Sequence, residues 1–156
     1  RVHRRQRQMC IRDRPGVELD TAIDTALSCG HQVILTLDQL LCFRSGCGVH
    51  LRKTDHLADA LDQLEQLNDP WPITAGIRHE RDIERKRMWP SDALLISPVR
   101  ETPSHGDMQP LGWERFSQLA RSVGVPVYAL GGMTREDQFT VTEHAGFGVA
   151  GIRGFQ

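Results

Sequence analysis

Residues 126–134 read Pro126-Val127-Tyr128-Ala129-Leu130-Gly131-Gly132-Met133-Thr134, an apolar run closed by two glycines. A continuous apolar run of this length is typical of a strand buried on both faces of a parallel sheet. Thr134 precedes a polar helix that is predicted to run through Glu143. Backbone N–H groups between the strand and the helix can bind phosphate, because glycine permits close approach and a helix N-terminus carries partial positive charge.

The same alternation of apolar run and amphipathic segment continues on both sides of this stretch. Strands are predicted at Val33–Leu37, Gly48–Leu51, Ile73–Ala75, Ala93–Ser97, Val127–Leu130 and Gly148–Ile152. Further helices are predicted at Leu19–Ser28, around Leu57, Leu61 and Leu64, and around Phe116, Leu119, Ala120 and Val123. Thr54 or Asp55 is expected to cap the helix that contains Leu57.

Repeated strand–helix units imply right-handed crossovers and a parallel sheet, so the chain is predicted to be an α/β protein. Such a sheet is either open or closed into a barrel. A (β/α)8 TIM barrel typically needs about 200 residues or more, whereas this chain has 156. If the chain belongs to a TIM barrel, we expect it to be a fragment of about six βα units, and the family resemblance given below implies that the missing part is N-terminal.

The composition indicates a soluble globular domain, with 39% hydrophobic and 25% charged residues. No apolar run approaches the roughly 18 residues of a membrane span, and no secretory leader is recognisable. The four cysteines show neither a C-x-x-C pair nor metal-ligand spacing, and Cys42 and Cys47 are expected to be core thiols. Reduced thiols in a cytoplasmic protein fit this pattern best.

The first 14 residues differ in charge from the rest. They hold six arginines and one acid, a net charge of +5, which leaves −6 for the remainder. A basic arm can bind nucleic acid or a membrane surface, but we interpret residues 1–14 as a non-native or disordered leader. The domain is assigned to residues 15–156, and its acidity argues against nucleic acid as a partner.

A second glycine-bearing segment follows the last predicted strand, as Gly151-Ile152-Arg153-Gly154. TIM barrels build phosphate sites from the loops after their last two strands. The phosphate-binding residues are therefore predicted to be Gly131, Gly132, Ile152 and Arg153, with Arg153 as a charged donor. The alternatives are a plain tight turn at the glycine pair and an ordinary surface arginine.

The segment Pro98–Gly112 is predicted to be a long loop, and it holds the candidate catalytic residues Thr102, Ser104 and His105. Hydroxyl groups can bind phosphate or pyrophosphate, and a histidine can donate a proton; the alternative is a solvated loop.

Two further side chains are candidates for a functional role, one as a metal ligand and one in catalysis. Asp55 follows a strand end, and one carboxylate can hold Mg²⁺ when substrate phosphates supply the other oxygens, although a helix cap is the simpler role. His79 is either catalytic or a packed or capping histidine.

Several motifs resemble the thiamine phosphate synthase and thiazole tautomerase superfamily. They are Gly48-Val49-His50-Leu51, Asp92–Val99, Thr102-Pro103-Ser104-His105, Leu111-Gly112, Pro126–Met133 and Ala145–Ala150. These motifs are most similar to those of the C-terminal domain in fusions with a Nudix hydrolase. The resemblance implies a TIM barrel that joins hydroxymethylpyrimidine diphosphate to thiazole phosphate and releases pyrophosphate in thiamine biosynthesis, assisted by Mg²⁺. Its partners would be these small phosphorylated molecules, without nucleic acid or membrane.

The resemblance also assigns roles to particular positions. Asp55 falls on a metal-binding aspartate, Thr102 and Ser104 on phosphate-holding hydroxyls, Gly132 on the thiazole-phosphate glycine, and Ile152 and Arg153 on phosphate-binding amides. The sequence departs from the family where His105 replaces a lysine, Ile77 and Arg153 each replace a serine, and Thr36-Leu37-Asp38 stands where an Asn-Asp pair is expected. Pro98 replaces the histidine used by the tautomerases.

Three functional hypotheses follow. The first is a transferase of the thiamine phosphate synthase type. The second is a catalytically degenerate barrel that binds a phosphorylated ligand, as the detached C-terminal domain of a Nudix fusion. The third is a non-functional fragment.

Overall fold

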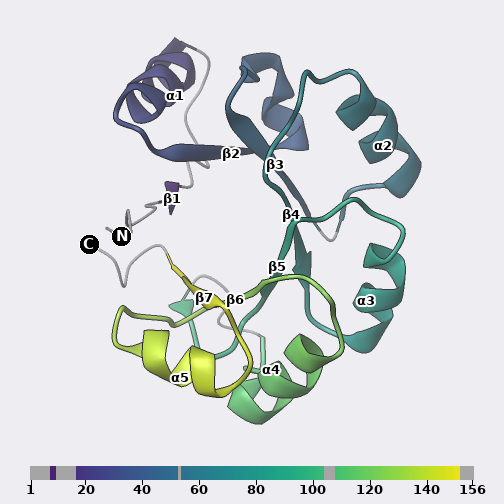
Figure 1. Ribbon diagram of the computed structural model, residues 1–156, viewed down its shortest axis with the longest axis vertical. Helices are drawn as coiled ribbons and strands as arrows, with labels where there is room; N and C mark the ends of the chain where they lie inside the picture. Colours follow the sequence, from purple (N-terminus) through teal and green to yellow (C-terminus); the bar gives the residue numbers. More distant parts are fainter. Residues whose placement is uncertain (1–7, 10–16, 53, 104–107, 152–156) are drawn as a thin grey trace. The chain divides into compact units, whose positions relative to one another are not determined.

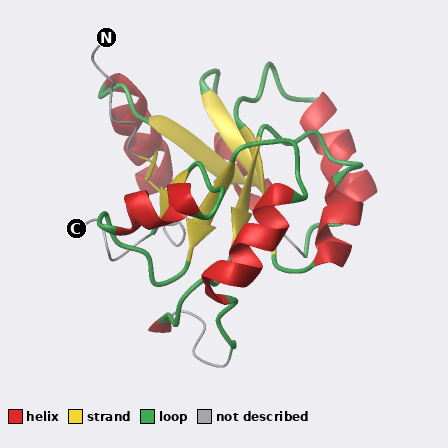
Figure 2. Ribbon diagram, turned by 60° about the horizontal axis from the view of Figure 1, so that its bottom comes forward, coloured by secondary structure: helices red, strands yellow, loops and turns green. Residues whose placement is uncertain are grey.

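The computed structural model describes residues 8–9, 17–52, 54–103 and 108–151. The chain forms two compact units, residues 1–73 and 74–156. Strands and helices alternate along both (Figure 2). Among the described helices, none combines the length and apolarity that crossing a membrane requires.

The first unit contains three parallel strands that pair in chain order. Its elements are β1 (Gln8–Met9), α1 (Val17–Ser28), β2 (Gln32–Thr36), the 3-10 helix η1 (Leu37–Cys42), β3 (Cys47–Leu51) and α2 (Leu57–Glu65). β2 pairs with β3 in the register Val33 to Cys47, and β1 pairs with the start of β2. Strand β1 lies within the predicted leader, whose assignment as non-native stays a prediction.

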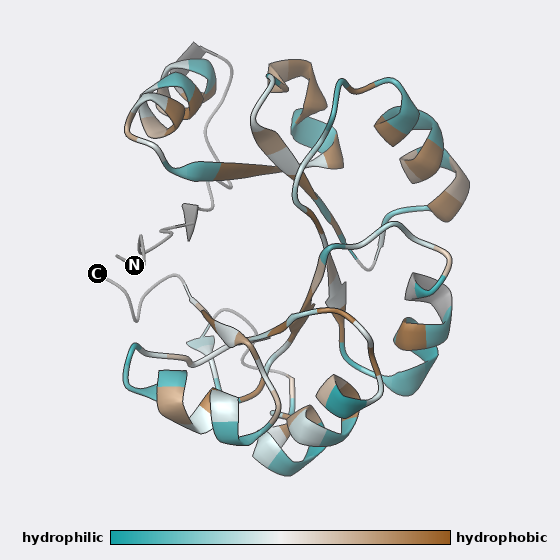
Figure 3. Ribbon diagram, in the orientation of Figure 1, coloured by the Kyte–Doolittle hydropathy of each residue, from teal (hydrophilic) through white to brown (hydrophobic). Residues whose placement is uncertain are grey.

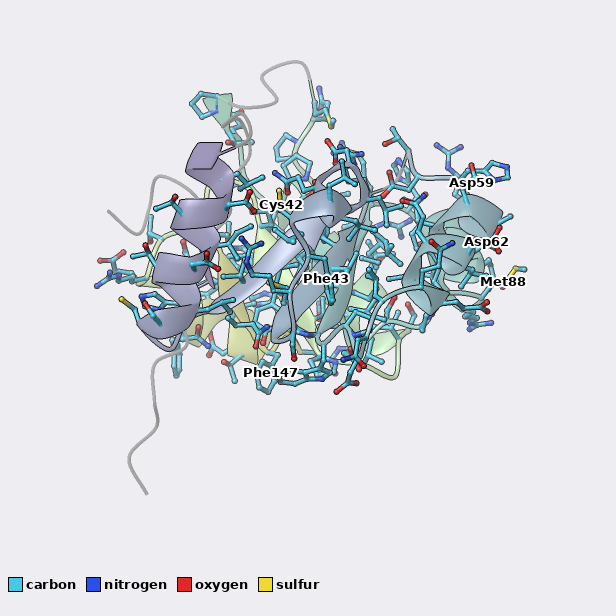
Figure 4. All side chains as sticks on the ribbon, turned by 90° about the horizontal axis from the view of Figure 1, so that it is seen from above. Cys42, Phe43, Asp59, Asp62, Met88 and Phe147 are labelled. Carbon is cyan, nitrogen blue, oxygen red and sulfur yellow. The ribbon has the colours of Figure 1, made fainter. Side chains whose placement is uncertain are left out.

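The core of the first unit is formed where α1 packs on β2 and β3. Leu19, Ile23 and Ala26 of α1 share one helical face and are buried with Val33, Leu35 and Cys47. Cys42 and Phe43, which follow one another at the end of η1, pack against this cluster (Figure 4). On α2 the buried residues are Ala60 and Leu64, whereas Asp59 and Asp62 are exposed on its outer side.

The second unit repeats the strand–helix pattern. Its elements are β4 (Ile73–Ile77), α3 (Glu80–Lys86), β5 (Ala93–Ile96), α4 (Gly112–Arg121), β6 (Val127–Leu130), α5 (Asp137–Glu143) and β7 (Gly148–Ala150). β4, β5, β6 and β7 pair in parallel and in chain order (Figure 1). Hydrophobic colouring runs along much of the strands, whereas the helices carry both hydrophilic and hydrophobic positions (Figure 3). The α/β class and the parallel pairing are thus confirmed, while the truncated barrel stays a prediction.

One local expectation is wrong, and one helix that ends where predicted starts a little later than Thr134. Helix α2 has His56 as its N-cap, without a side-chain cap, so neither Thr54 nor Asp55 caps it; the Asp55 carboxylate is bonded to Arg52 instead. Helix α5 begins at Asp137, three residues after Thr134, because the Asp137 carboxylate holds residues 134–137 in a turn before the helix.

The described thiols differ in exposure, which gives a first test of the packing. Cys47 is fully buried and Cys29 is exposed, and burial raises the pKa of the Cys47 thiol. Because the thiolate is the reactive form, we expect iodoacetamide to label Cys29 in the folded chain and to label Cys47 only after denaturation, as read by peptide mass spectrometry. Equal labelling rates in the folded chain would contradict the described core.

Candidate functional site

The glycine turn after β6 is held against the segment that follows β5. The N–H of Val99 donates to the Leu130 carbonyl at 2.9 Å, and the N–H of Arg100 donates to the Gly131 carbonyl at 3.1 Å. The ladder between β5 and β6 thus continues beyond both strand ends. Since the carboxyl ends of parallel strands carry the binding sites of most α/β proteins, this is a natural position for a ligand site.

Both glycines are required by space and by backbone conformation. Gly131 and Gly132 have φ angles of 93° and 67°, in the left-handed region. A Cβ added at Gly131 would lie 2.7 Å from the Cβ of Pro98, and one at Gly132 would lie 2.5 Å from the Glu101 carbonyl oxygen. The predicted turn and its close backbone approach are therefore present, and the partner in that approach is the candidate loop itself.

The N–H groups of this turn differ in whether they have a protein acceptor. The N–H of Thr134 donates to Oδ2 of Asp137 at 2.9 Å, so a carboxylate already occupies that donor. Within the described residues, the N–H groups of Gly132 and Met133 have no protein acceptor. Among the described residues, the N–H groups without an acceptor therefore lie in the glycine turn rather than at Thr134 before α5.

Arg100 is the cation beside the turn, and sequence reasoning missed it. Its guanidinium makes two contacts with Asp137, from Nη2 to Oδ1 at 2.7 Å and from Nη1 to Oδ2 at 3.1 Å. The Asp137 side chain is 6% exposed, whereas the Arg100 side chain is 46% exposed. Oδ2 of Asp137 also accepts the Thr134 hydroxyl at 3.1 Å. This bidentate pair ties the loop after β5 to the loop after β6.

The segment Leu111-Gly112-Trp113 closes the other side of the loop. The N–H groups of Leu111 and Gly112 donate to the carbonyls of Pro98 and Val99, at 2.9 and 3.0 Å. The Trp113 ring centroid lies 5.5 Å from the Arg100 guanidinium carbon, which is a cation–π contact. The long loop therefore starts and ends at the same place, beside the glycine turn.

The predicted site residues of the second unit are only partly brought together. Thr102 is half-buried and follows Glu101, whose carbonyl faces Gly132, so it belongs to the same loop contact. Ser104, His105, Ile152 and Arg153 lie outside the described residues. His79 lies between β4 and α3, where its N–H donates to the Asp82 carboxylate.

Asp55 belongs to the first unit, where it contacts an arginine. Its Oδ2 accepts the N–H of Arg52 at 2.6 Å, and its Oδ1 lies 3.3 Å from Nε of the same arginine. Nη2 of Arg52 is 3.2 Å from Oδ1 of Asp38. Asp38 and Asp55 thus contact the same arginine.

These residues do not fit a metal held by the first unit. Both candidate carboxylates already pair with a guanidinium, and the described residues contain no group of three or more His, Cys, Asp or Glu side chains placed to hold an ion. Mg²⁺ needs oxygen ligands at about 2.0–2.1 Å in octahedral geometry. The Arg52 side chain would have to leave before Asp55 could supply one.

Comparison with known proteins identifies relatives of one kind. The family model described as "Thiamine monophosphate synthase" matches residues 23–155. A thiamine-phosphate synthase from Albidiferax ferrireducens is 30% identical over 117 residues, which are 74% of this chain and 45% of that protein. A protein from Aquifex aeolicus is 37% identical over 65 residues, covering 42% of this chain and 35% of its own length. This chain thus spans less than half the length of these curated relatives.

A solved structure shares the fold. The thiamine phosphate pyrophosphorylase from Pyrococcus furiosus superposes with a TM-score of 0.70 at 21% sequence identity. The match covers 93% of this chain and 70% of that one. At this level of identity the likeness is one of fold.

Proposed function

Since the chain belongs to the thiamine monophosphate synthase family, we propose that it works as a thiamine phosphate synthase. In the proposed reaction, the C–O bond of hydroxymethylpyrimidine diphosphate breaks and pyrophosphate leaves with the electron pair. The ring nitrogen of thiazole phosphate forms the new C–N bond. Such a site must stabilise the leaving charge, orient the nucleophile and exclude water.

The glycine turn is the observation that carries this proposal. The N–H groups of Gly132 and Met133, which have no acceptor among the described residues, offer donors to a phosphate, and the half-exposed Arg100 adds a cation beside them. We assign the thiazole phosphate to this turn. Thr102, on the contacting loop, is proposed to bind the diphosphate with Ser104 and His105, and Ile152 and Arg153 are proposed to add donors to the thiazole phosphate.

The cation and the setting of the reaction are also part of the proposal. Mg²⁺ is proposed to arrive on the diphosphate as part of the substrate, because Asp55 is engaged by Arg52. Its chemistry there would be to neutralise the leaving pyrophosphate. The described cysteines, Cys29, Cys42 and Cys47, are free thiols, and we propose a cytoplasmic location on that basis. We further propose that the chain is the C-terminal part of a Nudix fusion, which the upstream reading frame would test.

Turnover tests the function directly. We expect the full chain, given both substrate halves and MgCl₂, to form thiamine phosphate and pyrophosphate, as detected by mass spectrometry. Thr102→Val removes one proposed hydrogen bond to a charged group and should lower kcat/KM by roughly 10- to 100-fold. Thr25→Val, at an exposed position on α1, is the matched control and should change nothing.

The contrary outcomes have separate meanings. A folded chain that binds thiamine phosphate but forms no product would replace the synthase with the ligand-binding barrel. A folded chain that binds neither thiamine phosphate nor its substrates would remove both functions.

A further inference from the structure

Arg52 lies between two carboxylates that come from different segments of the first unit. Asp38 stands in the first turn of η1, after β2, and Asp55 lies in the loop between β3 and α2. The guanidinium contacts the first through Nη2 and the second through Nε, at 3.2 and 3.3 Å. β2 and β3 are paired neighbours, so the arginine bridges the ends of two adjacent strands.

Burial makes the Asp55 contact the stronger part of this bridge. The Asp55 side chain is 6% exposed, against 42% for Arg52 and 61% for Asp38. A carboxylate that has lost most of its water needs a nearby cation or several hydrogen bonds. Arg52 supplies both, through its guanidinium and through its own backbone N–H at 2.6 Å.

The pKa of Asp38, the exposed carboxylate of the two, is lowered from its usual value. Hydrogen bonding from the Thr36 hydroxyl is the main cause that lowers the pKa of Asp38, and the Arg52 guanidinium contributes. Both acids that face Arg52 therefore meet a fixed positive charge from the same chain.

We propose that the Arg52 guanidinium takes the place of a divalent cation between Asp38 and Asp55. The negative charge of the two carboxylates is then balanced by an arginine of the same chain. A guanidinium carries its charge at every accessible pH and presents donors in a fixed fork, which suits two carboxylates at the ends of neighbouring strands. A divalent ion between the carboxylate oxygens of Asp38 and Asp55 would need the space that the Arg52 guanidinium occupies. In the folded chain the two acids are closed to Mg²⁺.

This inference rests on the proposed function in one respect, because the resemblance to the synthases assigns a metal-binding role to Asp55. Its test measures cation binding and does not require turnover, so failure of one can be told from failure of the other. It also separates a metal delivered on a substrate from one held by the protein.

The first arm uses the unmodified chain. We titrate it with Mn²⁺, a spectroscopic stand-in for Mg²⁺, and follow the free ion by electron paramagnetic resonance. We expect no saturable Mn²⁺ binding that depends on the Asp55 carboxylate. Saturable Mn²⁺ binding that is lost in D55N, a variant that keeps Arg52, would overturn the proposal.

The second arm removes the internal cation. R52Q should melt at a lower temperature than the unmodified chain, and MgCl₂ should raise its Tm by about 3 °C more than KCl of the same ionic strength does. The double variant R52Q/D55N should lose this difference, because the buried acid is gone. R115Q, which removes an exposed arginine paired with Glu80, is the matched control and should show no specific Mg²⁺ effect.

Two results in this arm would also overturn the proposal. One is an R52Q chain that folds and gains nothing from Mg²⁺ beyond the salt effect. The other is an unmodified chain that MgCl₂ stabilises as strongly as it stabilises R52Q. If R52Q fails to fold, the titration of the unmodified chain and of D55N decides the question.

Discussion

Gly132→Ala is expected to destabilise the second unit by about 2–4 kcal/mol and to abolish phosphate binding at the turn. The new Cβ would lie 2.5 Å from the Glu101 carbonyl oxygen and 2.8 Å from the Cβ of Arg100, and both neighbours belong to a segment pinned by ladder hydrogen bonds. The φ angle of 67° adds strain for any residue with a side chain. The loop after β5 must move away, and the unpaired amides move with the turn. Chemical denaturation measures the first effect, and calorimetry with thiamine phosphate measures the second.

Two other glycines separate the causes of this effect. Gly30 has a φ angle of 75° with nothing within 4 Å of an added Cβ, so Gly30→Ala measures the backbone strain without a clash. Gly124 has neither a positive φ angle nor a close neighbour, and Gly124→Ala should cost nothing measurable. We expect the three costs to rank Gly132, then Gly30, then Gly124. If Gly132→Ala and Gly30→Ala cost the same, the close approach to Glu101 is not what the turn requires.

The same turn illustrates how much of the fold was predictable. Val127–Leu130 was predicted with its observed bounds, because a continuous apolar run ended by glycines leaves little freedom for a strand to begin or end elsewhere. Gly131 and Gly132 were singled out because glycine amides after a strand can approach a phosphate closely. By contrast, η1 was not predicted, because Leu37–Cys42 follows a strand directly and its start depends on the Gln39 side chain, which accepts the Thr36 backbone N–H at 3.1 Å.

The missed parts of the candidate site are pairs between distant positions. Arg100 and Asp137 are separated by 37 residues, so no local pattern joins them. Arg52 was overlooked because an arginine after a strand is usually a surface residue, and only the fold places its fork between Asp38 and Asp55. Parallel strands bring loops together at one edge, and charges on those loops meet without any spacing rule. A useful signal would have been one basic and one acidic residue placed just after the ends of two successive predicted strands.

Arg100→Met is the second substitution with a large expected effect, at about 2 kcal/mol of lost stability. Methionine keeps an apolar stem near Trp113 but removes the bidentate partner of a carboxylate that is 6% exposed. Asp137 would retain the Thr134 N–H and hydroxyl as donors, so the cost stays below that of a carboxylate left with no partner. Asp137→Asn should be destabilising too, because the amide cannot accept from both loops as two charged oxygens do. Chemical denaturation of each variant provides the free energies.

The coupling between the two residues decides whether they act as one unit. A double-mutant cycle with Arg100→Met and Asp137→Asn should give an interaction energy of about 1–3 kcal/mol. Arg115→Met is the matched control, since Arg115 pairs with Glu80 on the surface and both side chains are largely exposed; it should cost less than about 1 kcal/mol. Additive effects in the cycle would mean that the pair does not hold the two loops together. Coupling without any loss of thiamine phosphate affinity would mean that the pair stabilises the fold and leaves the phosphate donors in place, so that the glycine turn alone positions them.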